Sequence, residues 1–144
     1  MHLIGLTDLL RHDDSFRATL ARLQNGDSLD WNIIRAARPY VLATLADAWN
    51  APIVVLTSTG RQAYNIAEQL PVWVEDTARI YRFAEPTPMF YDRLPWDKTV
   101  IQDRIDTLQA LLYADEGGTQ PIVITSARAL MQRTMPVNQF RKNS

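Results

Sequence analysis

The chain has 144 residues, enough to bury one hydrophobic core, so we expect one domain or most of one rather than a multidomain assembly. Its 15 lysines and arginines are balanced by 16 aspartates and glutamates. This balance excludes the overall positive field that captures nucleic acid or acidic membranes nonspecifically. The absence of cysteine excludes disulfides, thiolate nucleophiles and sulfur-ligated metals.

The N-terminal stretch is not expected to be a secretory signal. Asp8 and the pair Asp13 and Asp14 come too early for the apolar region of a signal peptide. Nowhere do about 18 apolar residues run together, as a membrane-spanning helix requires. We therefore expect a soluble cytoplasmic protein without a membrane partner.

Residues 1–30 are predicted to form a helical extension. Apolar residues recur at helical spacing on both sides of Asp13, where an aspartate can cap a second helix, and Asn25 with Gly26 is a typical helix stop. An alanine-rich helix is then predicted to begin near Arg38, because the missing N–H of Pro39 costs nothing in a first turn.

Three short runs are predicted to be strands: the apolar residues 53–57 and 121–125, and residues 78–83, whose most apolar member is Ile80. The first has the composition of a strand buried on both faces. Thr59 and Ser126 are predicted to cap the helices that follow the first and third strands. The helix after Thr59 should bury four residues: Ala63, Ile66, Ala67 and Leu70. Strands that alternate with helices predict an α/β fold with an open parallel sheet flanked by helices.

The stretch FYDRLPWDKTVIQDRIDTLQALL, residues 90–112, begins as a loop around Pro95. After this loop a helix is predicted to start at Thr99, which forms a capping box with Gln102, and to end at the glycine pair 117–118. Its apolar face should carry Ile101, Ile105, Leu108 and Leu112, and its solvated face Gln102, Asp103, Asp106 and Gln109. Residues 137–144 show no periodicity, which is typical of the truncated start of a connection.

Candidate chemistry is sparse. The turn from Thr57 to Arg61 offers hydroxyls, a glycine and an arginine for phosphate, but helix capping explains the same residues and a Walker-type glycine pattern is missing. His2 and His12 have no partner at a metal-ligand spacing. We predict no catalytic residue, no bound cofactor and no metal site in this chain.

A nucleic-acid surface is the alternative that composition suggests. In residues 79–104 five cations interleave with aromatic rings, but four acids leave a net charge of only one. Residues 126–144 carry four cations and no acid. The candidate partner surface drawn from these stretches consists of Arg79, Tyr91, Arg93, Trp96 and Arg133.

The order of these motifs resembles the start of the bacterial transcription-repair coupling factors. The first module of that family is similar to the P-loop subunit of nucleotide excision repair. The resemblance covers residues 33–136. It is carried by the stretches IVVLTSTGRQAYNIAEQL, FYDRLPWDKTVIQDRIDTLQALL and IVITSARALMQRTMP, with Tyr91, Asp92, Arg104, Thr107, Leu108, Thr125 and residues 129–133 as the most telling positions.

The resemblance implies a partial RecA-like, P-loop-type lobe within a large ATP-dependent DNA translocase. That protein displaces stalled RNA polymerase at DNA lesions and recruits the damage-recognition subunit of excision repair. Its expected partners are DNA, RNA polymerase, that damage-recognition subunit, and the rest of its own polypeptide. ATP and Mg²⁺ belong to a motor far C-terminal to a segment like this one. The contact with the damage-recognition subunit is expected in a subdomain that follows it.

The related P-loop subunit of excision repair has a true P-loop at the position that corresponds to residues 32–39. Here glycines are absent, Arg38 stands in place of the lysine, and Pro39 replaces the residue that binds magnesium. The resemblance therefore implies a degenerate nucleotide site at Arg35, Arg38 and Pro39. Residues 31–136 would be a non-catalytic scaffold lobe. The enzyme activity would belong to the parent protein. The alternative is an independent small α/β domain that binds nucleic acid or uses phosphate.

Overall fold

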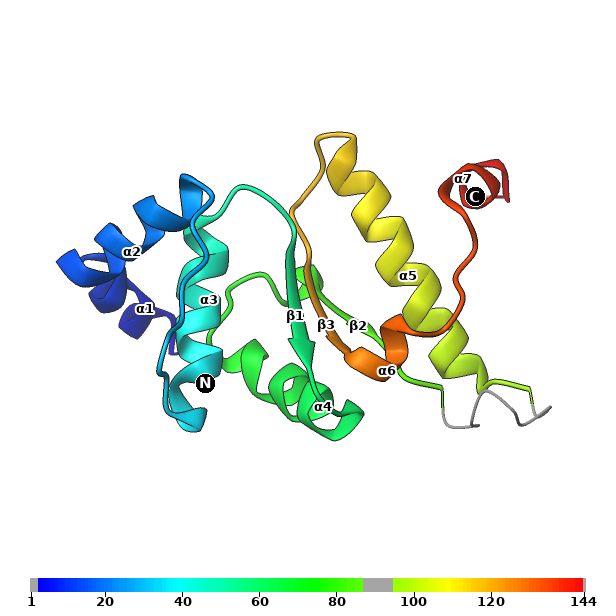
Figure 1. Cartoon of the computed structure of the whole chain (residues 1–144), viewed down its shortest axis with the longest axis horizontal. Helices are drawn as coiled ribbons and strands as arrows, with labels where there is room; N and C mark the ends of the chain where they lie inside the picture. The colour runs from blue at the N-terminus through cyan, green and yellow to red at the C-terminus, as the bar shows by residue number, and fades with distance from the viewer. Residues whose placement is uncertain (1–2, 87–94, 144) are drawn as a thin grey trace.

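A three-stranded parallel sheet forms the centre of the computed structural model, which describes residues 3–86 and 95–143. The strands are β1 (Ile53–Thr57), β2 (Ile80–Phe83) and β3 (Ile122–Ser126), in the order β1-β3-β2 (Figure 1). Ile53 and Ile80 both lie in register with Ile122 of the central strand. The predicted α/β class and parallel sheet are confirmed.

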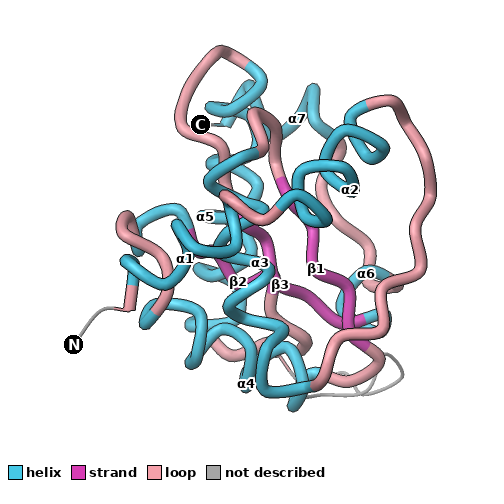
Figure 2. The backbone as a smooth tube through the Cα atoms, turned by 90° about the vertical axis from the view of Figure 1, so that its left-hand side faces the viewer, coloured by secondary structure: helices cyan, strands magenta, loops and turns pink. Residues whose placement is uncertain are grey.

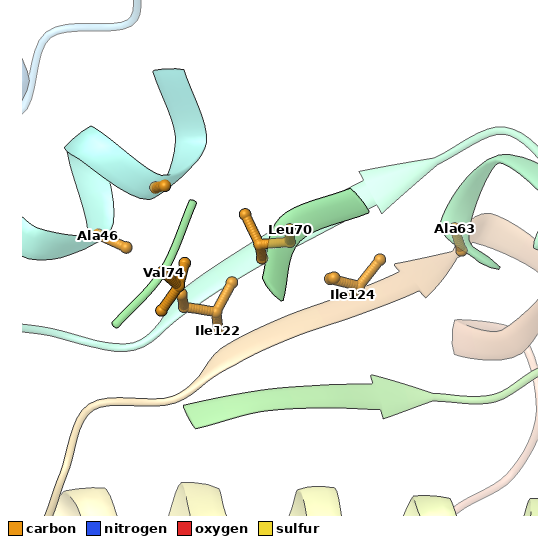
Figure 3. Close-up of a cluster of buried hydrophobic side chains, with 7 residues drawn as sticks. Ala46, Ala63, Leu70, Val74, Ile122 and Ile124 are labelled. Carbon is orange, nitrogen blue, oxygen red and sulfur yellow. The ribbon is translucent and has the colours of Figure 1, made fainter. Parts of the chain in front are cut away.

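Helices cover the two faces of the sheet. On one face α3 (Arg38–Ala48) and α4 (Gly60–Gln69) enclose the main hydrophobic core, which Figure 3 shows. Its buried members are Ala43, Ala46, Ala63, Leu70, Val74, Ile122 and Ile124. On the other face α5 (Lys98–Asp115) and α6 (Ala127–Leu130) pack on Phe83 and Val123 (Figure 1). The strand β3 is consequently buried along its whole length.

The N-terminal helices α1 (Ile4–Arg11) and α2 (Asp14–Gln24) form the predicted helical extension. Helix α1 packs on α3 (Figure 2). The hydroxyl of Tyr40 donates to the carbonyl of Leu6 at 2.8 Å, and Arg11 pairs with Asp47 at 3.2 Å. The extension therefore lies against the helix that begins at Arg38.

Most helix starts follow the predicted caps. Asp13, Thr59 and Ser126 each accept a hydrogen bond from an amide of the first turn. The predicted capping box at Thr99 is wrong, because α5 begins earlier in the chain: Asp97 caps it and accepts the Thr99 amide at 2.8 Å. An aspartate is a stronger cap than threonine, and its charge also interacts with the helix dipole.

Hydrogen bonds lower the pKa of the two aspartate caps. For Asp13 the largest cause is the hydroxyl of Ser15, followed by the amide of Phe16, and for Asp97 it is the amide of Thr99. Each folded-state pKa lies below the ordinary value of 3.8. The stabilisation from these carboxylates is therefore present above that value and is lost as the pH falls through the folded-state pKa.

We expect the Asp97→Asn variant to lose less stability on acidification than the wild type, because asparagine accepts the same amide without titrating. Urea midpoints of both proteins at about pH 6 and about pH 3 measure this difference. Burial raises the pKa of Asp47, so its contribution has the opposite sign and is lost as the pH rises, but it is common to both proteins. Equal falls in the two midpoints would contradict the prediction.

The structure corrects the burial predicted for β1. Val54 is 55% exposed and Leu56 is 57% exposed, although the composition predicted a strand buried on both faces. The reason is topological: β1 is an edge strand, and α5 packs mainly on β2 at the opposite edge. The fully buried strand is the central β3.

The orientation of α5 also differs from the prediction. Arg104, Thr107 and Ala114 are buried, whereas Ile101 and Ile105 are each 40% exposed. The helix is rotated so that the guanidinium of Arg104 reaches buried carbonyl groups. The spacing of apolar residues along the helix does not predict this rotation.

Two polar regions form structure that was not predicted, one an ion pair and the other a helix. Asp103, expected on a solvated face, bonds to Arg82 at 2.6 Å. Residues expected to lack regular structure form the helix α7 (Val137–Asn143), which Arg141 links to Asp115 at 3.3 Å. Both interactions join residues far apart in the sequence, so local periodicity does not reveal them.

Candidate functional site

Arg35, Arg38 and Pro39 line one pocket of about 390 Å³ together with the turn after β1. The short 3₁₀ helix at Arg35–Ala37 and the start of α3 form one side, and α4 forms another. The lining residues are Arg35, Arg38, Pro39, Leu42, Val55, Leu56, Thr57, Ser58, Gln62, Asn65, Ile66 and Gln69. Two segments that the sequence singled out separately for phosphate thus belong to one site.

The pocket is positively charged. Within the described part of the chain its lining contains two arginines and no carboxylate, and neither Arg35 nor Arg38 forms an ion pair there. Leu42, Val55 and Ile66 add an apolar wall. This combination can attract an anion that carries an apolar group.

The described lining of this pocket differs from that of a P-loop. Among residues 3–86 and 95–143 no glycine lines it, and Pro39, which is buried, has no N–H to offer at the start of α3. The hydroxyl of Ser58 donates to Gln62 at 2.9 Å, and that of Thr57 is within hydrogen-bonding distance of the carbonyls of Thr59 and Thr125. A P-loop instead surrounds phosphates with backbone amides that glycines make accessible.

A second polar centre lies at the carboxyl ends of β2 and β3, where Arg104 is only 4% exposed. Its guanidinium donates to the carbonyls of Ala84 at 3.1 Å and Ala129 at 3.2 Å, and it lies 3.8 Å from the ring centroid of Phe83 and 5.1 Å from that of Trp96. Burial lowers the pKa of Arg104. Arginine nevertheless stays protonated in proteins, so this side chain joins the strand ends as a buried cation.

Glu85 connects the turns beside this centre. It accepts the Ser126 hydroxyl at 2.8 Å and pairs with Arg128 at 3.1 Å. A Cβ atom on Gly60 would lie 2.9 Å from the Glu85 carboxylate, so glycine permits the close approach of the first turn of α4. Glu85 thus joins the end of β3, the start of α6 and the first turn of α4, and we assign this cluster to the frame of the fold.

Three of the five residues of the candidate partner surface lie in the described part of the chain: Arg79, Trp96 and Arg133. Trp96 and Arg133 line a groove of about 560 Å³ beside α5. Arg79 is 18% exposed and donates to the carbonyls of Ala46 and Gln120, near the C-terminal end of α3. Tyr91 and Arg93 lie outside the described residues.

Several cations of the possible stacking surface for nucleic acid form contacts within the protein. Arg79 and Arg104 direct their guanidinium groups to main-chain carbonyls, and Arg82 pairs with Asp103. The residues that the structure describes contain no group of three or more potential metal ligands. In those same ranges no helix is long and apolar enough to cross a membrane.

Fold and site together define a small parallel α/β lobe with an arginine-lined pocket at the carboxyl end of its edge strand. The chain is similar to the transcription-repair-coupling factors of Mycobacterium bovis and Mycobacterium tuberculosis, with 27% identity over 135 residues in each case. The match covers 92% of this chain but only 11% of either relative. No protein-family model and no solved structure matches the chain.

Proposed function

We propose that this chain is the N-terminal, non-catalytic scaffold and interaction lobe of a cytoplasmic transcription-repair coupling factor. The parent would be an ATP-dependent DNA translocase that displaces stalled RNA polymerase at lesions and recruits the damage-recognition subunit of excision repair. The similarity to two coupling factors along 92% of the chain supports the parentage. The small parallel sheet is compatible with a partial P-loop-type frame.

The chemistry of the pocket carries the non-catalytic part of the proposal. Arg38 and Pro39 stand where the resemblance places the lysine and the magnesium-binding residue of a P-loop, and they line the pocket at the start of α3. Without the lysine and the glycine-bordered amides of a P-loop, a phosphoryl group beside Arg35 and Arg38 would lack the backbone cradle that positions it for transfer. ATP and Mg²⁺ therefore belong in this proposal to the motor of the parent protein.

We expect a calorimetric titration of the 144-residue chain with ATP and Mg²⁺ to show only heats of dilution. The pocket supplies positive charge but no amide cradle, so attraction for the triphosphate should be weak and sensitive to salt. Saturable binding at micromolar affinity would contradict the proposal. An Arg35→Gln, Arg38→Gln double variant then shows whether such binding occurs in this pocket.

Nucleic-acid binding is the second candidate, because Arg35 and Arg38 lie together in a pocket whose described lining contains no acidic residue. If the chain binds DNA there, a mobility shift at low salt should weaken steeply as salt rises and should be lost in the same double variant. No shift at low salt would exclude this candidate.

A further inference from the structure

The groove beside α5 lies between this helix and residues 131–143, which lead into and form α7 (Figure 1). Its volume of about 560 Å³ is within the range of pockets that bind a ligand or a few residues of a peptide. Most of its wall is apolar, formed by Trp96, Ile101, Ile105, Leu108, Met135 and Phe140.

Part of this apolar wall is open to solvent. Ile101, Ile105 and Met135 are all exposed, although each is a large apolar side chain. Positions 101, 105 and 108 lie on one face of α5 because of the helical spacing. Large apolar side chains that are exposed together in a concave site are typical of an interaction surface, whereas single exposed ones are ordinary.

The groove is also positively charged. Arg104 and Arg133 line it, and no carboxylate does so within residues 3–86 and 95–143. In those ranges neither arginine forms an ion pair. The buried guanidinium of Arg104 donates to two main-chain carbonyls and, at 3.4 Å, to the hydroxyl of Thr134. A buried cation without a counter-charge is costly, and a carboxylate placed beside it lowers that cost.

The nearby carboxylates of α5 are engaged elsewhere. Asp103 pairs with Arg82 at 2.6 Å, and Asp106 accepts the side-chain amide of Gln102 at 2.8 Å. Asp97 caps the first turn of the helix. None of these three acids lines the groove, so its positive charge is available to an incoming anion.

We propose that this groove binds a short segment of a separate protein, in which a carboxylate is flanked by bulky apolar side chains. The carboxylate would bind the guanidinium of Arg133, close to the buried charge of Arg104, and the apolar side chains would cover Ile101 and Ile105. The inference does not depend on the parentage proposed above, because every residue that carries it belongs to this chain.

The lining favours a protein segment over a nucleic acid. Proteins that bind single strands combine several exposed cations along the phosphates with rings that stack on the bases. In the described lining Arg133 is the exposed cation, whereas Arg104 is buried and directed to carbonyls. The aliphatic side chains of α5 offer no platform for stacking.

Selection of short random peptides on the 144-residue chain tests the chemistry of the occupant. We expect the enriched peptides to carry aspartate or glutamate next to leucine, isoleucine, phenylalanine or tryptophan. The strongest of them, synthesised with blocked ends, should lose affinity by about tenfold when its acids are replaced by the matching amides. Enrichment of peptides without an acid, or no enrichment above an unrelated protein, would overturn the proposal.

Substitutions in the groove locate the binding. Arg133 is exposed, so Arg133→Gln should keep the melting temperature of the chain but weaken the selected peptide by about tenfold. Arg133→Glu should select basic instead of acidic peptides. The matched control is Arg61→Gln, at an exposed position on α4 across the sheet, which should bind the peptide normally. Equal binding by the wild type and both Arg133 variants would contradict the proposal.

The apolar half of the groove has its own test. Ile105→Gln should weaken the selected peptide about as much as Arg133→Gln does, because it removes apolar contact from the middle of the wall. Leu9→Gln, at a position on α1 that is 69% exposed, is the control and should have no effect. Equal effects of these two substitutions would place the peptide outside the groove and overturn the proposal.

Two further measurements identify other occupants. Displacement of the peptide by a short oligothymidylate, with an affinity that falls steeply as salt rises, would indicate a nucleic-acid site and overturn the proposal. Loss of peptide binding as the chain dimerises at higher concentration, followed by sedimentation, would identify a second copy as the occupant and would also overturn it. We expect neither result: the peptide should resist the oligonucleotide and bind a monomer.

Discussion

Replacing Arg104 with alanine is expected to lower the free energy of unfolding by about 3–4 kcal/mol. The substitution removes a buried guanidinium that bonds to the carbonyls of Ala84 and Ala129 and lies against two aromatic rings. It leaves both carbonyls without this donor and opens a cavity beneath α5. Urea unfolding, followed by far-UV circular dichroism, measures the change.

The matched control is Arg104→Lys, which keeps the charge but loses the planar group that reaches both carbonyls and stacks on Phe83. We expect it to recover only part of the lost stability. A loss of less than about 1 kcal/mol in the alanine variant would contradict the central role given to this cation. Full recovery by lysine would show that charge alone, rather than the planar geometry, accounts for the effect.

Replacing Leu70 with alanine is expected to destabilise the protein by about 3 kcal/mol, within the range for fully buried leucines. Leu70 is 0% exposed and follows α4 directly, within the core cluster that contains Ile122 and Ile124 of β3 (Figure 3). The smaller side chain would leave a cavity between the helical layer and the sheet. The shift of the urea midpoint at an unchanged slope measures the loss.

Leu130→Ala is the control for Leu70→Ala, because Leu130 is 52% exposed at the end of α6. We expect its effect to stay within about 0.5 kcal/mol. Similar effects of the two substitutions would mean that the layer between α4 and the sheet does not form the main core.

The elements set by local sequence are those that could be predicted. Strands β1 and β3 are short apolar runs, and the caps at Asp13, Thr59 and Ser126 depend on amides within the next three residues. Asp97 carried a usable signal that was missed. An aspartate directly before a lysine and a threonine is itself a good helix start.

The remainder depends on contacts between distant segments. The sequence of β1 has the composition of a buried strand, and its exposure follows only from the sheet order. Likewise, the burial of Arg104 depends on the carbonyls of Ala84 and Ala129, which lie far from it in the sequence. Helical periodicity alone gives no sign of these contacts. The position of Glu85 between the turns depends on its contacts with Gly60 and Ser126, which are also distant in the sequence.

The candidate site shows the same division. Sequence reasoning identified Arg35, Arg38 and Pro39 through a resemblance, and Ser58 through its place after a strand. It treated them as separate features. The starts of α3 and α4 lie beside the carboxyl end of β1, so these residues line one pocket.

The size of the native polypeptide that contains this sequence tests the central claim most directly. Tryptic peptides from residues 62–79 and 105–128 can be followed by mass spectrometry in size-separated extracts of the source cells. If the chain is one lobe of a coupling factor, these peptides will be found in a protein several times larger than 16.4 kDa. Their recovery only at 16.4 kDa would contradict the account.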